Sequence, residues 1–169
     1  EFENGQPIGN GNILVQVVNK PVKEALDQSH TGFMLGYWFD SDDIRWQEFL
    51  PTYDNLSSIE IYLGRDGNPG NAIIEIRTLE NHVLAQNFIN ESDIHRYGWV
   101  RVEYSEPLSL VPGIKYRIYV YSDQPSSTPE NRYFWFGDRD SPYDSNCETD
   151  LFYFMPDFDY AFRTSAIPN

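Results

Sequence analysis

Residues 56–63 are LSSIEIYL, and this stretch decides the fold class. Ile59, Ile61 and Leu63 fall on one side of an extended chain, while Glu60 and its polar neighbours fall on the other. A period of two, built from β-branched and aromatic residues, is typical of a strand with one buried face and one solvent face. The stretch therefore predicts a half-buried β-strand.

The same alternation recurs outward from this strand in both directions. It is clear in KYRIYVYS at 115–122 and in WVRVEY at 99–104, and further strands are expected at 72–78, 83–88 and 160–164. Dense turn sequences separate these strands, for example DGNPGN at 66–71, because Gly permits positive φ and Pro fixes φ. Short strands at this spacing predict an all-β chain that forms an antiparallel β-sandwich of the jelly-roll type.

The chain of 169 residues is long enough to bury one core, and we expect one domain. Residues 26–169 form the predicted single jelly-roll domain, and residues 1–25 form an N-terminal extension or first strand packed on it. The only helical candidate is PVKEALDQS at 21–29. The opening residues lack the basic start and apolar run of a signal peptide, so we expect a fragment excised from a larger protein.

The charge balance limits the partners. The chain carries 26 acidic and 12 basic residues, a formal net charge of −14. Such a surface repels phosphate backbones and anionic lipids, which argues against nucleic acid and membrane partners. Cys147 is the single cysteine, which excludes an intrachain disulfide and a CxxC metal site.

Two long segments, 30–43 and 122–159, interrupt the regular rhythm of strands and turns, and long loops in compact domains often carry function. Both segments are rich in aspartate, and Ca²⁺ prefers carboxylate oxygens from such loops. The alternative is that Asp is common in loops because it favours turns. The predicted calcium ligands are Asp40, Asp42, Asp43, Asp138, Asp140, Asp144, Asp157 and Asp159.

The same segments hold aromatic residues that suit a sugar, because apolar sugar faces stack on flat rings while hydroxyls bond to polar neighbours. The predicted sugar-binding residues are Tyr37, Trp38, Tyr133, Trp135 and Tyr143. Alternation in RYFWF at 132–136 allows only one pair of rings to be exposed, and we expect Tyr133 and Trp135 to be that pair. Trp46 is expected in the core, and Trp99 is a second candidate for an exposed ring.

Several charged and aromatic residues on other strands also point outward by alternation. Cross-strand ion pairs are the favoured interpretation of this set. Its members are Glu60, Tyr62, Arg77, Arg101, Glu103, Arg117, Tyr119 and Tyr121.

The order of short motifs adds a resemblance. The motifs are LDQS at 26–29, RWQEFLPT at 45–52, LSSIEIYL at 56–63, GNPG at 67–70, PGIKY at 112–116 and DYAFRT at 159–164. This order resembles the jelly-roll modules appended to secreted bacterial and archaeal hydrolases and surface proteins, many of which bind carbohydrate. The resemblance implies a secreted or cell-surface location, a structural calcium ion, and aromatic residues that bind polysaccharide or oligosaccharide. It also implies a neighbouring catalytic or surface domain in the parent chain.

Catalysis finds little support in the sequence. His30, His82 and His95 are far apart, and the chain has no GxSxG, HExxH or phosphate-loop motif. We therefore predict a non-catalytic, monomeric carbohydrate-binding module. Two alternatives stay open, a calcium-stabilised accessory domain without sugar binding and a small polysaccharide-active enzyme.

Overall fold

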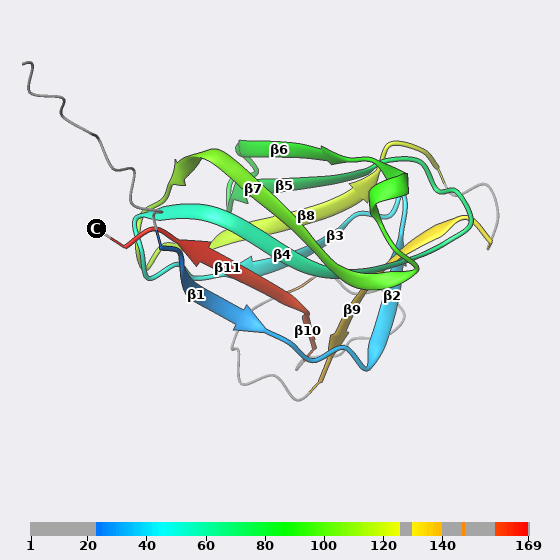
Figure 1. The fold of residues 1–169 in the computed structure, drawn as a ribbon, viewed down its shortest axis with the longest axis horizontal. Helices are drawn as coiled ribbons and strands as arrows, with labels where there is room; N and C mark the ends of the chain where they lie inside the picture. Colours follow the sequence, from blue (N-terminus) through cyan, green and yellow to red (C-terminus); the bar gives the residue numbers. More distant parts are fainter. Residues whose placement is uncertain (1–22, 126–129, 140–146, 148–157, 169) are drawn as a thin grey trace, which may run out of the picture.

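The computed structural model describes residues 23–125, 130–139, 147 and 158–168. Two antiparallel sheets pack face to face around one core (Figure 1). This arrangement confirms the predicted all-β sandwich. Within the described residues the single helical element is the 3₁₀ turn η1 (Glu91–Asp93), and no helix there is long and apolar enough to cross a membrane.

The strand order is that of a jelly roll. The larger sheet contains β1 (Ala25–His30), β2 (Leu35–Phe39), β4 (Asn55–Asp66), β7 (Tyr97–Ser109), β9 (Arg132–Asp138), β10 (Asp159–Tyr160) and β11 (Phe162–Ala166). The smaller sheet contains β3 (Arg45–Phe49), β5 (Ala72–Thr78), β6 (Val83–Ile89) and β8 (Tyr116–Ser122). In the larger sheet β2, β9, β4 and β7 lie side by side, and in the smaller sheet the order is β3, β8, β5, β6.

The long strand β4 organises the larger sheet. Its C-terminal part, from Leu63 onward, pairs with β9, and residues 58–61 pair with β11. On the far side of these two strands, β2 pairs with β9 and β1 pairs with β11. β9 and β11 therefore occupy successive stretches of the same edge of β4, and both run antiparallel to it.

The core lies between the sheets and follows the predicted alternation. Ile59, Ile61 and Leu63 of β4 are buried, as are Ile118 and Val120 of β8. Burying such side chains removes about 25 cal/mol of unfavourable hydration per Å² of apolar surface, which is the main drive for this packing.

The sequence prediction was wrong in two respects. The helix expected at 21–29 is absent where the structure describes that range, since Ala25–His30 forms β1 and pairs with β11 from Ala25↔Ala166 to His30↔Phe162. Pairing with a neighbouring strand outweighs a weak helical preference. The segments 30–43 and 122–159, expected to be irregular, contain β2 and β9 respectively. Residues 1–22 lie outside the described part, so the predicted N-terminal extension stays a prediction.

Candidate functional site

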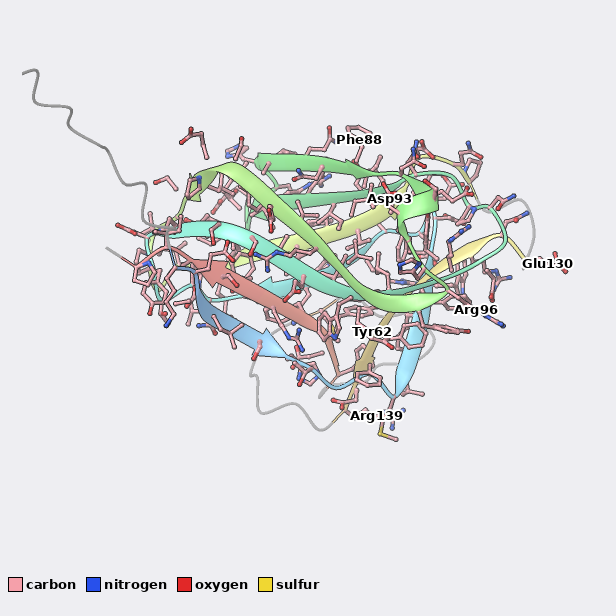
Figure 2. The ribbon with its side chains drawn as sticks, viewed as in Figure 1. Tyr62, Phe88, Asp93, Arg96, Glu130 and Arg139 are labelled. Carbon is pink, nitrogen blue, oxygen red and sulfur yellow. The ribbon has the colours of Figure 1, made fainter. Side chains whose placement is uncertain are left out.

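The outward side of the larger sheet carries a cluster of aromatic rings, which we call the aromatic face. Tyr62 of β4, labelled in Figure 2, lies at the centre of this cluster. The aromatic face consists of Phe33, Tyr62, Tyr97, Trp99, Phe134 and Phe136. Phe33 is 52% exposed and Tyr97 is 49% exposed, so rings here are open to solvent.

The rings contact one another in regular geometry. Tyr62 stacks on Phe33, with centroids 4.7 Å apart and an angle of 15° between the rings. It meets Trp99 edge-on at 5.5 Å and Phe136 edge-on at 5.8 Å. Tyr97 meets the other rings through Phe136, at 5.6 Å and 76°. Stacked and perpendicular pairs at these distances stabilise each other, so the cluster holds a fixed shape.

Two glycines make room for this arrangement. A Cβ on Gly36 would lie 2.7 Å from the Phe136 ring. A Cβ on Gly64 would lie 2.7 Å from the Tyr97 ring and 2.9 Å from the Phe136 ring. Phe136 therefore occupies space that side chains on the neighbouring strands β2 and β4 would otherwise fill.

Charged groups border the aromatic face on one side. The Arg163 guanidinium lies over the Trp99 ring at 4.0 Å, a cation–π contact, and forms an ion pair with Glu60 at 3.5 Å. Arg101 follows next on the same side of β7, and it bonds to Glu103 at 2.8 Å. A ligand on the rings would thus have hydrogen-bonding groups within reach.

The outward side of the smaller sheet differs, and we call it the charged face. Glu75 is 3% exposed and accepts hydrogen bonds from Arg77, Gln86 and Tyr121. Glu48, also buried, binds Lys115 and Arg117, each at 3.1 Å.

The arginines of the charged face lie on its aromatic rings. Arg117 covers Trp46 at 4.2 Å, and Arg77 covers Tyr119 at 4.3 Å. The expected core position of Trp46 is wrong, because alternation in β3 turns Gln47 and Phe49 inward and Trp46 outward. Burial alone would raise the pKa of Glu48, but the bonds from Lys115 and Arg117 outweigh it and leave that pKa below its ordinary value. Ion pairs therefore account for this face. The Arg117–Glu48 pair joins two strands, as the sequence analysis favoured, whereas Arg77 pairs with Glu75 on its own strand.

The structure separates the predicted sugar-binding residues. The expected exposure of Tyr133 and Trp135 is wrong, because both are 0% exposed. Trp135 stacks on Tyr160 at 4.5 Å and donates a hydrogen bond to the Ala161 carbonyl, while Tyr133 stacks on Phe39. Rings with no exposed surface have no face to offer a sugar in solution.

The remaining predicted rings have different positions. Tyr37 points into the core, edge-on to Phe158 at 5.0 Å. Trp38 is opposite Phe134 in the β2–β9 register, so it lies beside the aromatic face, with Arg132 at 5.1 Å from its ring. Tyr143 lies outside the described residues.

The predicted calcium ligands in the described part have protein partners. The Asp40 carboxylate accepts hydrogen bonds from the backbone N–H groups of Asp42 and Asp43, at 2.7 and 2.9 Å. Asp43 forms a two-point ion pair with Arg45, with both contacts at 2.8 Å. These bonds fit the alternative that the first aspartate group shapes a turn.

The second aspartate group is divided. Asp138 lies 3.1 Å from His30, and Asp159 accepts a 2.7 Å hydrogen bond from Gln47. Asp140, Asp144 and Asp157 lie outside the described residues. Over the described ranges no group of three or more His, Cys, Asp or Glu side chains is placed to hold a metal ion.

Sequence reasoning found part of the aromatic face. It placed Tyr62 and Trp99 outward, as the structure has them. It missed Tyr97 and also Phe33, which lies in the connection between β1 and β2. It missed Phe134 and Phe136 because alternation identifies which residues share a side but not which side is buried.

The chain matches no protein-family model and no curated protein.

Proposed function

We propose that this chain is a non-catalytic carbohydrate-binding module that holds a neutral polysaccharide or oligosaccharide on the aromatic face. The observation that supports this function best is the ring cluster around the half-buried Tyr62, in which Phe33 and Tyr97 are exposed. Arg163, Glu60 and Arg101 border this cluster. Rings give apolar area for the C–H faces of a sugar, and the charged border gives partners for its hydroxyls. A net charge of −14 favours a neutral glycan over a polyanionic one.

Binding measurements on the full chain test this function. Isothermal titration with neutral cello-, xylo-, manno- and laminari-oligosaccharides is expected to give binding for at least one series. Tyr62→Ala removes the central ring and is expected to weaken that binding about tenfold or more, as truncation of a central aromatic anchor does. Trp46→Ala is the control, since Trp46 is a ring on β3 of the smaller sheet, where it lies under Arg117. Equal loss in both variants, or no binding by the wild-type chain, would reject the proposal.

A second function is favoured by a different observation. Phe33, Met34 and Leu35 form an exposed apolar run, with Met34 81% exposed. Exposed apolar patches often mark protein contacts. An accessory domain that packs on a neighbouring domain of its parent chain would use this run. In that case Met34→Ser would weaken association with the neighbouring domain, and the oligosaccharide panel would give no heat of binding.

Calcium stabilisation remains part of the proposal. Chelator-treated chain is expected to melt at a lower temperature than chain in excess Ca²⁺, since ligand at about 100 times Kd adds about 2.7 kcal/mol. Identical melting curves with and without Ca²⁺ would remove the ion from the proposal and leave the glycan site unaffected.

A further inference from the structure

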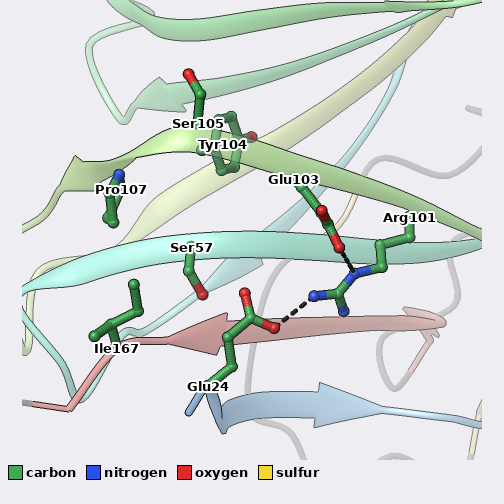
Figure 3. Close-up of a pocket in the computed structure, with 8 residues that line it drawn as sticks. All are labelled: Glu24, Ser57, Arg101, Glu103, Tyr104, Ser105, Pro107 and Ile167. Carbon is green, nitrogen blue, oxygen red and sulfur yellow. Dashed lines mark hydrogen bonds and ion pairs between the residues drawn. The ribbon is translucent and has the colours of Figure 1, made fainter. Parts of the chain in front are cut away.

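A polar hollow of about 380 Å³ lies on the larger sheet, beyond the charged border of the aromatic face (Figure 3). Glu24, Ser57, Arg101, Glu103 and Tyr104 line it. Figure 3 shows Pro107 and Ile167 at the end of the hollow that is farther from Arg101. Its volume is in the range of small-ligand sites.

An irregularity in strand pairing creates this hollow. Leu56 pairs with Leu108, and Ser58 pairs with Glu103. Residues 104–107 of β7 thus lie opposite the single residue Ser57 of β4. Extra residues on one strand bend it and redirect its side chains, and such bulges commonly lie beside functional sites. The bend in β7 leaves the space that the hollow occupies.

Two buried hydroxyls beside the hollow have unused hydrogen-bonding capacity: one belongs to Ser57, and the other to Tyr104, whose ring also packs against the core. The Tyr104 hydroxyl is buried and has no hydrogen-bond partner among the described residues. Burial raises the pKa of Tyr104, which keeps this group protonated and able to donate. The Ser57 side chain is 4% exposed, and its hydroxyl makes no hydrogen bond of normal geometry in the described part of the chain. A buried hydroxyl without a partner lowers stability, so both groups favour a polar ligand or water.

The charged groups of the hollow are already positioned. Arg101 bridges Glu24 and Glu103, which holds the two carboxylates on either side of its guanidinium. Burial alone would raise the pKa of Glu24, but Ser57 and Arg101 beside it outweigh that effect and keep the pKa below its ordinary value. Carboxylates accept and a guanidinium donates, so the hollow matches a group that carries several hydroxyls.

The hollow continues from the aromatic face. Arg101 lies two residues beyond Trp99 on the same side of β7, and Ser58 lies four residues before Tyr62 on β4. Four residues of strand span about 13 Å, so an oligosaccharide rather than one sugar would reach from ring to hollow. A chain that passes over Arg101 next meets Pro107 and Ile167.

We propose that this hollow binds the terminal sugar unit of a glycan whose preceding units lie on the aromatic face. The module would then recognise chain ends in preference to chain interiors. This inference rests on the proposed function, because it requires that a glycan binds the aromatic face.

The test compares Tyr104→Phe and Ser57→Ala with the wild-type chain on whichever neutral oligosaccharide series binds. Each change removes one hydroxyl, and each is expected to weaken oligosaccharide binding about three- to tenfold. Tyr121→Phe is the matched control, because it removes a hydroxyl from the charged face, where Tyr121 bonds to Glu75. Thermal melting of all variants checks that folding is kept.

Stoichiometry gives the second readout. Titration with the corresponding long polymer is expected to saturate at a fixed number of domains per chain end. Saturation in proportion to polymer mass, or unchanged binding by Tyr104→Phe and Ser57→Ala, would overturn end recognition while the aromatic face stands. Loss of binding in Tyr62→Ala alone would support the proposed function and reject this inference. No binding by the wild-type chain would reject both.

Discussion

The two outward faces of the sandwich use the same residue types in different ways. On the charged face, Arg117 and Arg77 lie on Trp46 and Tyr119, and the carboxylates of Glu48 and Glu75 are buried beneath them. On the aromatic face, rings such as Phe33 and Tyr97 contact other rings and stay open to solvent. An aromatic residue beside an arginine therefore does not identify a binding surface.

The two faces differ in whether their buried polar groups already have hydrogen-bond partners, and this property separates structural from ligand-binding polar surfaces. Glu75 has three neighbours that donate to it, so a ligand would have to replace bonds that the protein already makes. The Tyr104 hydroxyl has no partner in the described part of the chain, so a ligand there would add a bond. Adding a bond to a buried group gains more free energy than exchanging one.

The largest expected effect comes from breaking the charged face. Glu75→Ala leaves Arg77 without its carboxylate and removes the acceptor for Gln86 and Tyr121, so the free energy of unfolding should fall by about 3 kcal/mol. Urea unfolding measures this loss. Glu103→Ala is the control, because Glu103 is largely exposed and its removal should cost about 0.5 kcal/mol or less. A loss below that of the control would show that the charged face is not structural.

The next effect concerns the shape of the aromatic face. Gly64→Ala places a Cβ against the Tyr97 and Phe136 rings, which should cost about 1–2 kcal/mol and displace both rings. Glycan binding should weaken with the same substitution. Gly98→Ala is the matched control, since its Cβ would meet nothing within 4 Å. Crystal structures and titrations of both variants would show the displacement, and equal behaviour would contradict it.

Substitution of one tryptophan on each face distinguishes a binding role from a structural role. Trp99→Ala should weaken glycan binding about tenfold, or about 1.4 kcal/mol, because Trp99 contacts Tyr62 at the centre of the ring cluster. Trp46→Ala should leave binding unchanged and instead lower stability, because it removes the ring under Arg117. Titration and melting of both variants measure the two effects. The reverse pattern would move the binding site to the charged face.

The smallest effect is a pH dependence of stability. The pKa of Glu48 lies below its ordinary value of about 4.5, so its stabilisation is complete above that pH and is lost as pH falls through the lowered value. We expect a loss of about 1 kcal/mol or less in urea unfolding between pH 5 and pH 3 to depend on this residue. Glu48→Gln should flatten that part of the profile. An unchanged profile in the variant would assign the acid sensitivity to other carboxylates.

The sequence predicted the strands whose two faces differ in polarity. Alternation in β4 and β8 identified the buried side, because Ile59, Ile61 and Ile118 leave only one side apolar. In RYFWF both sides of the strand are aromatic, so polarity does not indicate which side is buried. The register decides it: Trp135 pairs with Leu63 of the core, and Phe134 pairs with Gly64 on the outside.

The hollow was beyond sequence reasoning for a different reason. Its shape depends on residues 104–107 lying opposite Ser57, and no local pattern in β7 reveals the register of its partner. The role of Gly36 and Gly64 could not be predicted for the same reason, because it depends on the Phe136 ring contributed by another strand. Contacts between distant strands, rather than local preferences, define the candidate site.

The pairing of β1 with β11 has a mechanical consequence. Ala25 lies opposite Ala166, so the points where the chain enters and leaves these strands are neighbours (Figure 1). Tension applied between those points acts along the inter-strand hydrogen bonds, which run perpendicular to antiparallel strands. The hydrogen bonds would then break one after another, which requires a lower force than pulling the two strands apart along their length, where the bonds must break together. Under load the sandwich would first lengthen by peeling β1 away, with the aromatic rings on β4 and β7 still in place.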